Sequence, residues 1–134
     1  MTPAERTLTE YFRLLSANDI DAWLHLWSDD GIDMHVPFAD GDLPKRVTDK
    51  EHLGRLYRDI GAGFVKLEFP SVELFPSVTG ERVFARWTPS GELTGGGSYT
   101  NQSVGLFEFD AEGRITRFWE YFSPLGFDDS FTLS

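Results

Sequence analysis

The fold is decided by residues 98–124, which read SYTNQSVGLFEFDAEGRITRFWEYFSP. Residues 98–109 and residues 114–122 each show a pattern of period two, which is the period of a β-strand. The intervening residues 110–113 are rich in turn-forming types. The segment therefore predicts two antiparallel strands joined by a hairpin turn.

Both faces of this hairpin carry large apolar side chains. In the second strand, one face carries Phe118 and Phe122, and the other face carries Ile115, Trp119 and Tyr121. The first strand places Tyr99, Asn101, Ser103, Gly105, Phe107 and Phe109 on one face and Thr100, Val104 and Leu106 on the other. A sheet with one face in water would carry polar residues there, so we expect both faces to be covered. With helices on one face, we predict a second copy of the chain on the other, which gives a homodimer.

The sequence before the hairpin predicts three helices and three further strands. Thr2-Pro3-Ala4-Glu5 is a capping box that opens a helix with Leu8, Tyr11, Phe12 and Leu15 on its inner face. A second helix follows the cap at Asn18 and Asp19 and ends at residues 29–31, and a third runs from the capping box at residues 48–51 to about Ile60. Strands are predicted at residues 32–38, 65–75 and 82–88, with a flexible loop at residues 89–97.

The helices come first and the strands follow, which is the order of an α+β fold rather than of a doubly wound parallel sheet. The 134 residues fit a single domain spanning residues 1–134. A formal charge of −10 without a Lys/Arg cluster makes nucleic acid and anionic membrane surfaces unfavourable partners. The absence of cysteine and of any apolar signal core leads us to expect a cytoplasmic protein.

Three stretches carry a resemblance to a known superfamily. They are EYFRLLSANDIDAWLHLWSDD at residues 10–30, VPFADGDLPKRV at residues 36–47, and the hairpin segment at residues 98–124. In these and in the order of its elements the chain resembles the nuclear-transport-factor-like superfamily, which includes ketosteroid isomerases, SnoaL-like polyketide cyclases and the phenazine biosynthesis A/B proteins. The resemblance implies a cone-shaped α+β barrel, in which a strongly curved mixed or antiparallel sheet wraps round three N-terminal helices. It also implies dimers formed on the outer sheet face.

The resemblance also assigns positions in the site. The ketosteroid isomerase tyrosine on the first helix falls on Tyr11, but the catalytic base falls on Val36 and the second oxyanion acid on Gly105. Neither of these two residues can act in that role, so the full ketosteroid isomerase constellation is not retained. In the phenazine A/B branch, which is the closest match, the ending supplies an acid/base glutamate that matches Glu120, while the histidine of that branch falls near Leu56.

Glu120 is the candidate catalytic residue. The resemblance turns Thr116, Phe118, Glu120 and Phe122 towards the cavity. A carboxyl group among aromatic rings loses hydration, which raises its pKa and suits a general acid or base. The alternative is that Glu120 pairs with Arg86 on a neighbouring strand. The candidate substrate-binding residues are Tyr99, Asn101, Ser103, Tyr11, Arg86, Phe118, Phe122, Val36, Trp27 and Tyr57.

The predicted function is that of a small cofactor-independent enzyme, an isomerase, cyclase or dehydratase. Glu120 would act as general acid/base on a small, largely apolar biosynthetic intermediate. No pair of histidines has metal-ligand spacing, so no metal is expected. The alternative is a non-catalytic dimer of the same fold that binds a small molecule, which the apolar Val36 and the missing side chain of Gly105 favour.

Overall fold

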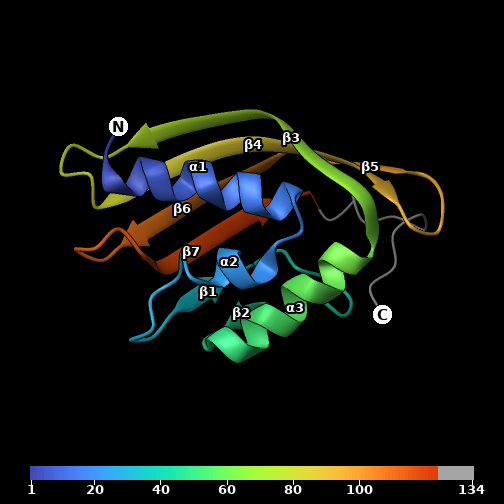
Figure 1. The fold of residues 1–134 in the computed structure, drawn as a ribbon, viewed down its shortest axis with the longest axis horizontal. Helices are drawn as coiled ribbons and strands as arrows, with labels where there is room; N and C mark the ends of the chain where they lie inside the picture. Colours follow the sequence, from blue (N-terminus) through green and yellow to red (C-terminus); the bar gives the residue numbers. More distant parts are fainter. Residues whose placement is uncertain (124–134) are drawn as a thin grey trace.

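A bent sheet wraps round three helices in the computed structural model, which describes residues 1–123 (Figure 1). The helices are α1 (Pro3–Ser16), α2 (Ile20–Leu24) and α3 (Lys50–Ala62). The strands are β1 (Asp33–His35), β2 (Arg46–Val47), β3 (Phe64–Pro76), β4 (Arg82–Leu93), β5 (Ser98–Thr100), β6 (Ser103–Phe109) and β7 (Ile115–Phe122). None of the helices within residues 1–123 is long and apolar enough to cross a membrane.

The strands form one mixed sheet in the order β2-β1-β7-β6-β4-β3, with β5 paired to β4. The pair β1 and β7 is parallel, and the other pairs are antiparallel. The long strand β3 curves over α1 and leads back to the end of α3 (Figure 1). This arrangement confirms the predicted α+β class with a curved sheet around N-terminal helices.

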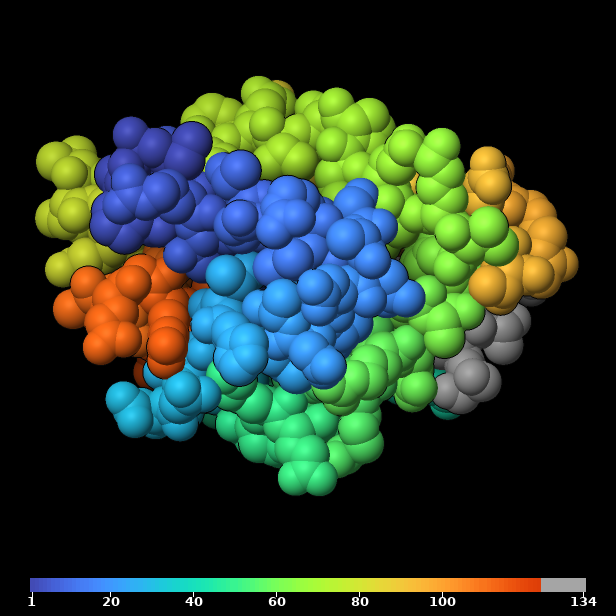
Figure 2. All heavy atoms as spheres, in the orientation of Figure 1, coloured from blue at the N-terminus to red at the C-terminus, as the bar shows by residue number. Residues whose placement is uncertain are grey.

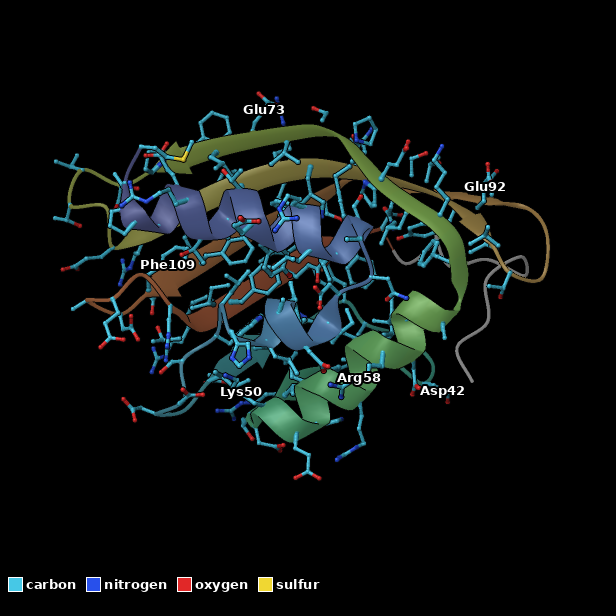
Figure 3. The ribbon with its side chains drawn as sticks, in the orientation of Figure 1. Asp42, Lys50, Arg58, Glu73, Glu92 and Phe109 are labelled. Atoms are coloured by element: carbon cyan, nitrogen blue, oxygen red, sulfur yellow. The ribbon has the colours of Figure 1, made fainter. Side chains whose placement is uncertain are left out.

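The helix starts follow local capping chemistry. Thr2 Oγ1 accepts a hydrogen bond from the Glu5 backbone N–H at 3.1 Å, and a Glu5 carboxylate oxygen accepts one from the Thr2 N–H at 3.2 Å. This confirms the capping box of α1. In α3 the cap is Asp49, whose carboxylate accepts a hydrogen bond from the His52 N–H at 2.7 Å, rather than the preceding threonine. Arg58 of α3 pairs with Asp21 of α2 at 2.5 Å and ties the two helices together (Figure 3).

The second helix is shorter than predicted. It ends at Leu24, and the chain then joins the sheet. Trp27 forms a parallel bridge with Ile115, the Ile115 N–H donates to the Leu26 carbonyl at 2.9 Å, and the Ser28 N–H donates to the Ile115 carbonyl at 2.8 Å. These sheet hydrogen bonds replace the helical ones. The helical spacing of Trp23 and Trp27 therefore predicted a helix end that lies too far along the chain.

The strand predicted at residues 32–38 is also shorter. Pro37 has no N–H to give to a ladder, and the chain turns there, with the Ala39 N–H donating to the Val36 carbonyl at 3.0 Å. Phe38, the last residue of the predicted strand, is therefore 58% exposed. The short strand β2, which pairs with β1, was not predicted from its turn-rich sequence.

Two changes affect the end of the sheet near the site. Strand β4 continues to Leu93 and pairs with β5, so the loop predicted at residues 89–97 is confined to residues 94–97. The strand predicted at residues 98–109 is interrupted at Asn101, whose amide oxygen accepts hydrogen bonds from the Gln102 and Ser123 N–H groups at 2.8 and 3.3 Å. The side chain of Asn101 thus takes the place of ladder partners.

The core lies between the concave face of the sheet and the helices, which lie side by side over it in Figure 2. Buried and half-buried residues alternate along β6, which confirms the inner face predicted for that strand. Phe107 and Phe118 stack at 4.0 Å between ring centroids across β6 and β7. A register shift between Glu108 and Phe109 turns Ile115 into the core, fully buried, although alternation had placed it outside.

Candidate active site

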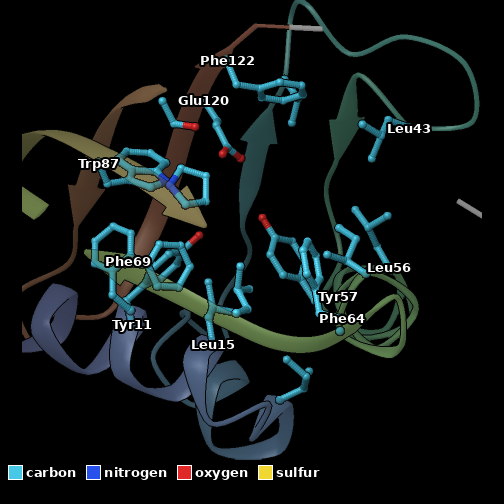
Figure 4. A pocket seen from close by; sticks show the side chains of 18 of the residues that line it. Tyr11, Leu15, Leu43, Leu56, Tyr57, Phe64, Phe69, Trp87, Glu120 and Phe122 are labelled. Carbon is cyan, nitrogen blue, oxygen red and sulfur yellow. The ribbon is translucent and has the colours of Figure 1, made fainter. Parts of the chain in front are cut away.

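A cavity of about 120 Å³ lies between the concave face of the sheet, α1, α3 and the loop that follows β1 (Figure 4). Its walls are mostly apolar. Leu43 and Pro44 of the loop and Leu56 and Ile60 of α3 supply aliphatic surface. The aromatic rings in the lining are those of Tyr11, Phe12, Tyr57, Phe64, Phe69, Trp87, Tyr99 and Phe122. This is the concave, largely apolar kind of space that binds small molecules in proteins.

Glu120 reaches the cavity because β7 turns its alternate residues inward. It lies opposite Gly105 in the β6–β7 ladder. A Cβ atom at Gly105 would lie 2.5 Å from Phe118 Cε1 and 2.9 Å from Trp87 Cη2, so the missing side chain leaves room for these two rings. Gly105 therefore shapes the wall beside Glu120. This structural role did not follow from the resemblance, in which the position of Gly105 belongs to the second oxyanion acid.

The carboxyl group of Glu120 points into the cavity (Figure 4). Within residues 1–123 it makes no hydrogen bond and no ion pair. Burial in this apolar setting disfavours the carboxylate and raises the pKa of Glu120 from 4.5 to about 7. Glu120 can therefore exist in both protonation states near neutral pH.

Arg86 does not pair with Glu120, which corrects the alternative drawn from the sequence. Arg86 Nη2 and Nε donate to Glu73 Oε1 at 2.6 and 2.9 Å on the other face of the sheet. Glu73 points away from the helices in Figure 3. The alternation of β4 explains this, because its buried residues Ala85 and Trp87 face inward on either side of Arg86.

Two tyrosines lie near Glu120. Tyr11 of α1 and Tyr57 of α3 line the cavity and are almost fully buried. Burial raises the pKa of Tyr11 well above its ordinary value, and the charge and hydrogen bonding of Tyr57 and the charge of Glu120 raise it further. Burial and the charge of Glu120 likewise raise the pKa of Tyr57. Both phenols therefore stay protonated at neutral pH and can donate hydrogen bonds.

Tyr99 and Asn101, predicted together as substrate-binding residues, have different places. Tyr99 lines the cavity, and burial raises its pKa to about 12. Asn101 is not part of the lining; its amide nitrogen donates to the Tyr99 hydroxyl at 2.8 Å and to the Ser123 carbonyl at 3.0 Å. Asn101 thus holds Tyr99 and the end of β7 in place instead of facing a ligand.

Phe118 and Trp27 are the other predicted binding residues that the structure places elsewhere. Both are fully buried, with ring centroids 6.3 Å apart, and belong to the core behind the cavity. Thr116, also expected inside, lies outside the lining because the register shift puts Ile115 inward. The remaining predicted residues, Ser103, Phe122, Val36, Tyr11 and Tyr57, are brought together around the cavity with Glu120.

Sequence reasoning missed Trp87, Phe69 and the loop residues Leu43 and Pro44. Trp87 could have been found, because Val83, Ala85 and Trp87 alternate with polar or exposed residues in β4 and are buried. Leu43 and Pro44 lie in a turn-rich loop without any periodic signal. Within residues 1–123 no group of three or more His, Cys, Asp or Glu side chains is arranged to hold a metal ion.

The raised pKa of Glu120 predicts a pH-dependent stability. Between pH 4.5 and 7 the folded protein holds a proton on Glu120 that the unfolded chain has released, so stability falls as pH rises through this range. We expect Glu120→Gln to be about 3 kcal/mol more stable than the wild type at pH 8 and equal to it near pH 4. Urea unfolding at both pH values measures this difference. A difference that does not change with pH would contradict the raised pKa.

A curved mixed sheet that wraps round three helices is the architecture of a nuclear-transport-factor-like fold, which solved structures similar to this chain share. The chain belongs to the SnoaL-like domain family, whose model matches residues 8–118. Its structural neighbours include polyketide cyclase-type, isomerase-type and phenazine biosynthesis-related proteins.

Three solved structures illustrate the similarity. A proposed isomerase from Bacillus subtilis is 24% identical with a TM-score of 0.85, over 96% of this chain and 91% of that one. A proposed polyketide cyclase from Pseudomonas putida is 18% identical with a TM-score of 0.80, over 98% and 99%. A Mycobacterium tuberculosis protein in complex with estradiol-17β-hemisuccinate is 21% identical with a TM-score of 0.80, over 92% and 95%. At these identities the similarity establishes the fold.

Proposed function

We propose that the protein is a small isomerase, cyclase or dehydratase in which Glu120 moves a proton on a largely apolar biosynthetic intermediate. The observation that carries the proposal is a carboxyl group that points into an apolar cavity without a hydrogen-bond or ion-pair partner among residues 1–123, and whose pKa burial raises to about 7. A general acid or base works best when its pKa lies near the working pH. A structural carboxylate, by contrast, would have an arginine, a lysine or several N–H groups around it.

The tyrosines supply the second part of this chemistry. Removing a proton next to a carbonyl group places negative charge on oxygen, and that charge needs hydrogen-bond donors. Tyr11 and Tyr57 are protonated donors beside Glu120, and they come from two different helices. In this proposal Glu120 takes the proton from carbon, and the phenols are among the cavity donors that stabilise the oxygen. Val36 and Leu56, which cannot ionise, contribute apolar wall.

Proton transfer can be measured without knowing the natural substrate. Phenylacetone is a small ketone with one benzene ring, and the C–H bonds next to its carbonyl group are acidic. We expect the protein to accelerate exchange of these protons for deuterium in D₂O, followed by proton NMR, above the rate in buffer alone. Binding of phenylacetone without any acceleration of exchange would favour the alternative function, a non-catalytic ligand-binding protein. The neighbour that holds estradiol-17β-hemisuccinate supports small-molecule binding in this fold.

We further propose that two copies pair through the outer sheet face, defined by Phe75, Phe84, Val104, Leu106, Trp119 and Tyr121. Phe75, Phe84 and Tyr121 are 50%, 44% and 37% exposed, and His35 stacks on Trp119 at 5.4 Å. Ion pairs border this apolar face, among them Arg82 with Glu108 at 2.9 Å. A second copy would present the same apolar centre and mixed charged border, which suits a two-fold contact.

Sedimentation tests this dimer. We expect the wild type to sediment as a dimer at micromolar concentration and Phe84→Glu to dissociate at least 100-fold more readily, because a charge would be buried at the centre of the contact. Val78→Glu, in the fully exposed turn between β3 and β4, is the matched control and should remain dimeric. A wild type that sediments only as a monomer would refute the proposal.

A further inference from the structure

Two hydrogen-bond donors in the cavity wall are not used by the chemistry described above. Trp87 and Ser103 are directly opposite each other in the β4–β6 ladder, and both line the cavity. They are only 4% and 3% exposed, and neither side chain makes a hydrogen bond to any residue within the range 1–123. The indole N–H groups of Trp23 and Trp27 also lack partners among residues 1–123, but those two residues are buried in the core and do not line the cavity.

The pairing of strands β4, β6 and β7 places the two donors close to Glu120. Ser103 lies opposite Phe122 on its other side, so Trp87, Ser103 and Phe122 form one row across three strands. The next row consists of Ala85, Gly105 and Glu120. Successive inward positions on a strand are roughly 7 Å apart. The small side chains of the second row let the six-membered ring of Trp87 lie beside Gly105, on the same wall of the cavity as Glu120.

The charges around the cavity restrict what these donors can hold. No lysine, arginine or histidine is among the described residues that line it, and Glu120 is the carboxylic acid there. A ligand carboxylate would lose its hydration, meet no cation and lie near Glu120, which is unfavourable. An uncharged carbonyl oxygen needs only neutral donors, and an indole N–H with a serine hydroxyl provides them.

We propose that Trp87 and Ser103 bind the carbonyl oxygen of an uncharged ligand and hold its neighbouring carbon towards Glu120. This inference rests on the proposed function, since it names the substrate class of the same cavity. It assigns Trp87 and Ser103 as specificity-determining residues that select a ketone or aldehyde over an apolar molecule of the same shape and over a carboxylate.

Binding of matched probes tests the inference directly. Acetophenone and α-methylstyrene have the same planar shape, but only acetophenone carries an acceptor oxygen, and benzoate adds a negative charge. We expect acetophenone to bind at least tenfold more tightly than the other two in NMR titrations of ¹⁵N-labelled protein. Acetophenone should shift one indole N–H resonance downfield, whereas α-methylstyrene should not. The resonance missing from the spectrum of Trp87→Phe identifies it.

Variants separate hydrogen bonding from packing. We expect Trp87→Phe and Ser103→Ala each to lower the preference for acetophenone over α-methylstyrene about fivefold, the effect of one lost hydrogen bond. The ratio within each variant corrects for changed cavity shape. Trp27→Phe, which also removes an indole N–H but lies outside the lining, should keep the wild-type ratio.

Three results would overturn the inference. They are a ketone preference that survives in both cavity variants, a Trp87 resonance that responds equally to both probes, and an absence of acetophenone binding up to its solubility limit. Because none of these probes has to react, the outcome is independent of whether Glu120 transfers a proton. A protein that selects ketones through Trp87 and Ser103 but exchanges no protons would retain this inference and lose the proposed enzymatic function.

Discussion

Replacement of Glu120 by glutamine is expected to slow deuterium exchange of phenylacetone at least 100-fold. Glutamine keeps the size of the side chain and its ability to hydrogen-bond, but it cannot take up a proton. General acid–base catalysis by one positioned group typically contributes about 10²- to 10⁴-fold, and Glu120, which lines the cavity, is the base in the proposed function. The exchange rate, measured by proton NMR in the wild type and in the variant, gives the effect.

The pH profile and a control variant make this expectation specific. The base is the carboxylate form, so the wild-type rate should rise with pH and level off above about 7, the pKa to which burial raises Glu120. Glu68→Gln, which removes an exposed carboxyl group paired with Lys66, should behave as the wild type. An exchange rate in Glu120→Gln equal to that of the wild type would refute the role of Glu120 as the base.

Phe118→Ala is expected to reduce the free energy of unfolding by about 3–5 kcal/mol, the usual cost of removing a fully buried phenylalanine. Phe118 is 0% exposed, stacks on Phe107 at 4.0 Å and contacts Tyr11 and Trp87, with centroids 6.2 Å away in both cases. The surrounding rings come from helix α1 and from strands β4 and β6, so they cannot close the space. Urea unfolding followed by circular dichroism measures the loss.

Phe122→Ala provides the matched control on the same strand. Phe122 also faces inward, but it is half-buried and borders the cavity, so water or neighbouring side chains can fill the space that it leaves. We expect it to cost less than half as much as Phe118→Ala. Equal losses for the two variants would contradict the distinction between core and cavity wall on β7.

The fold could be predicted well because its signals are local and periodic. The alternation of β6 and the capping box of α1 follow from residues near in sequence and appear in the structure as expected. The errors arose where distant segments compete. Ile115 accepts and donates backbone hydrogen bonds with the chain around Trp27, which shortens α2, and a register shift in the hairpin then turns Ile115 inward.

The candidate site was predictable to a smaller degree. Resemblance placed Glu120 and Tyr11 in the cavity, and strand alternation placed Tyr99 and Ser103 on its side of the sheet. Alternation alone could not tell that Asn101 turns its amide to Ser123, or that Phe118 lies behind the wall. Trp87 faces inward because it pairs with Ser103 of β6, so its neighbour Arg86 faces outward, away from Glu120. This direction becomes clear only when β4 is paired with β6.

Glu120 has no hydrogen-bond or ion-pair partner among residues 1–123, and in the proposed function its carboxyl group gains and loses a proton near neutral pH. Its carboxyl carbon can be followed by ¹³C NMR from pH 4 to 9, with Glu120→Gln identifying the resonance by its absence. We predict a midpoint near 7, because burial raises the pKa of Glu120 to about that value. A midpoint near 4.5, the ordinary value for a solvated glutamate, would contradict the account.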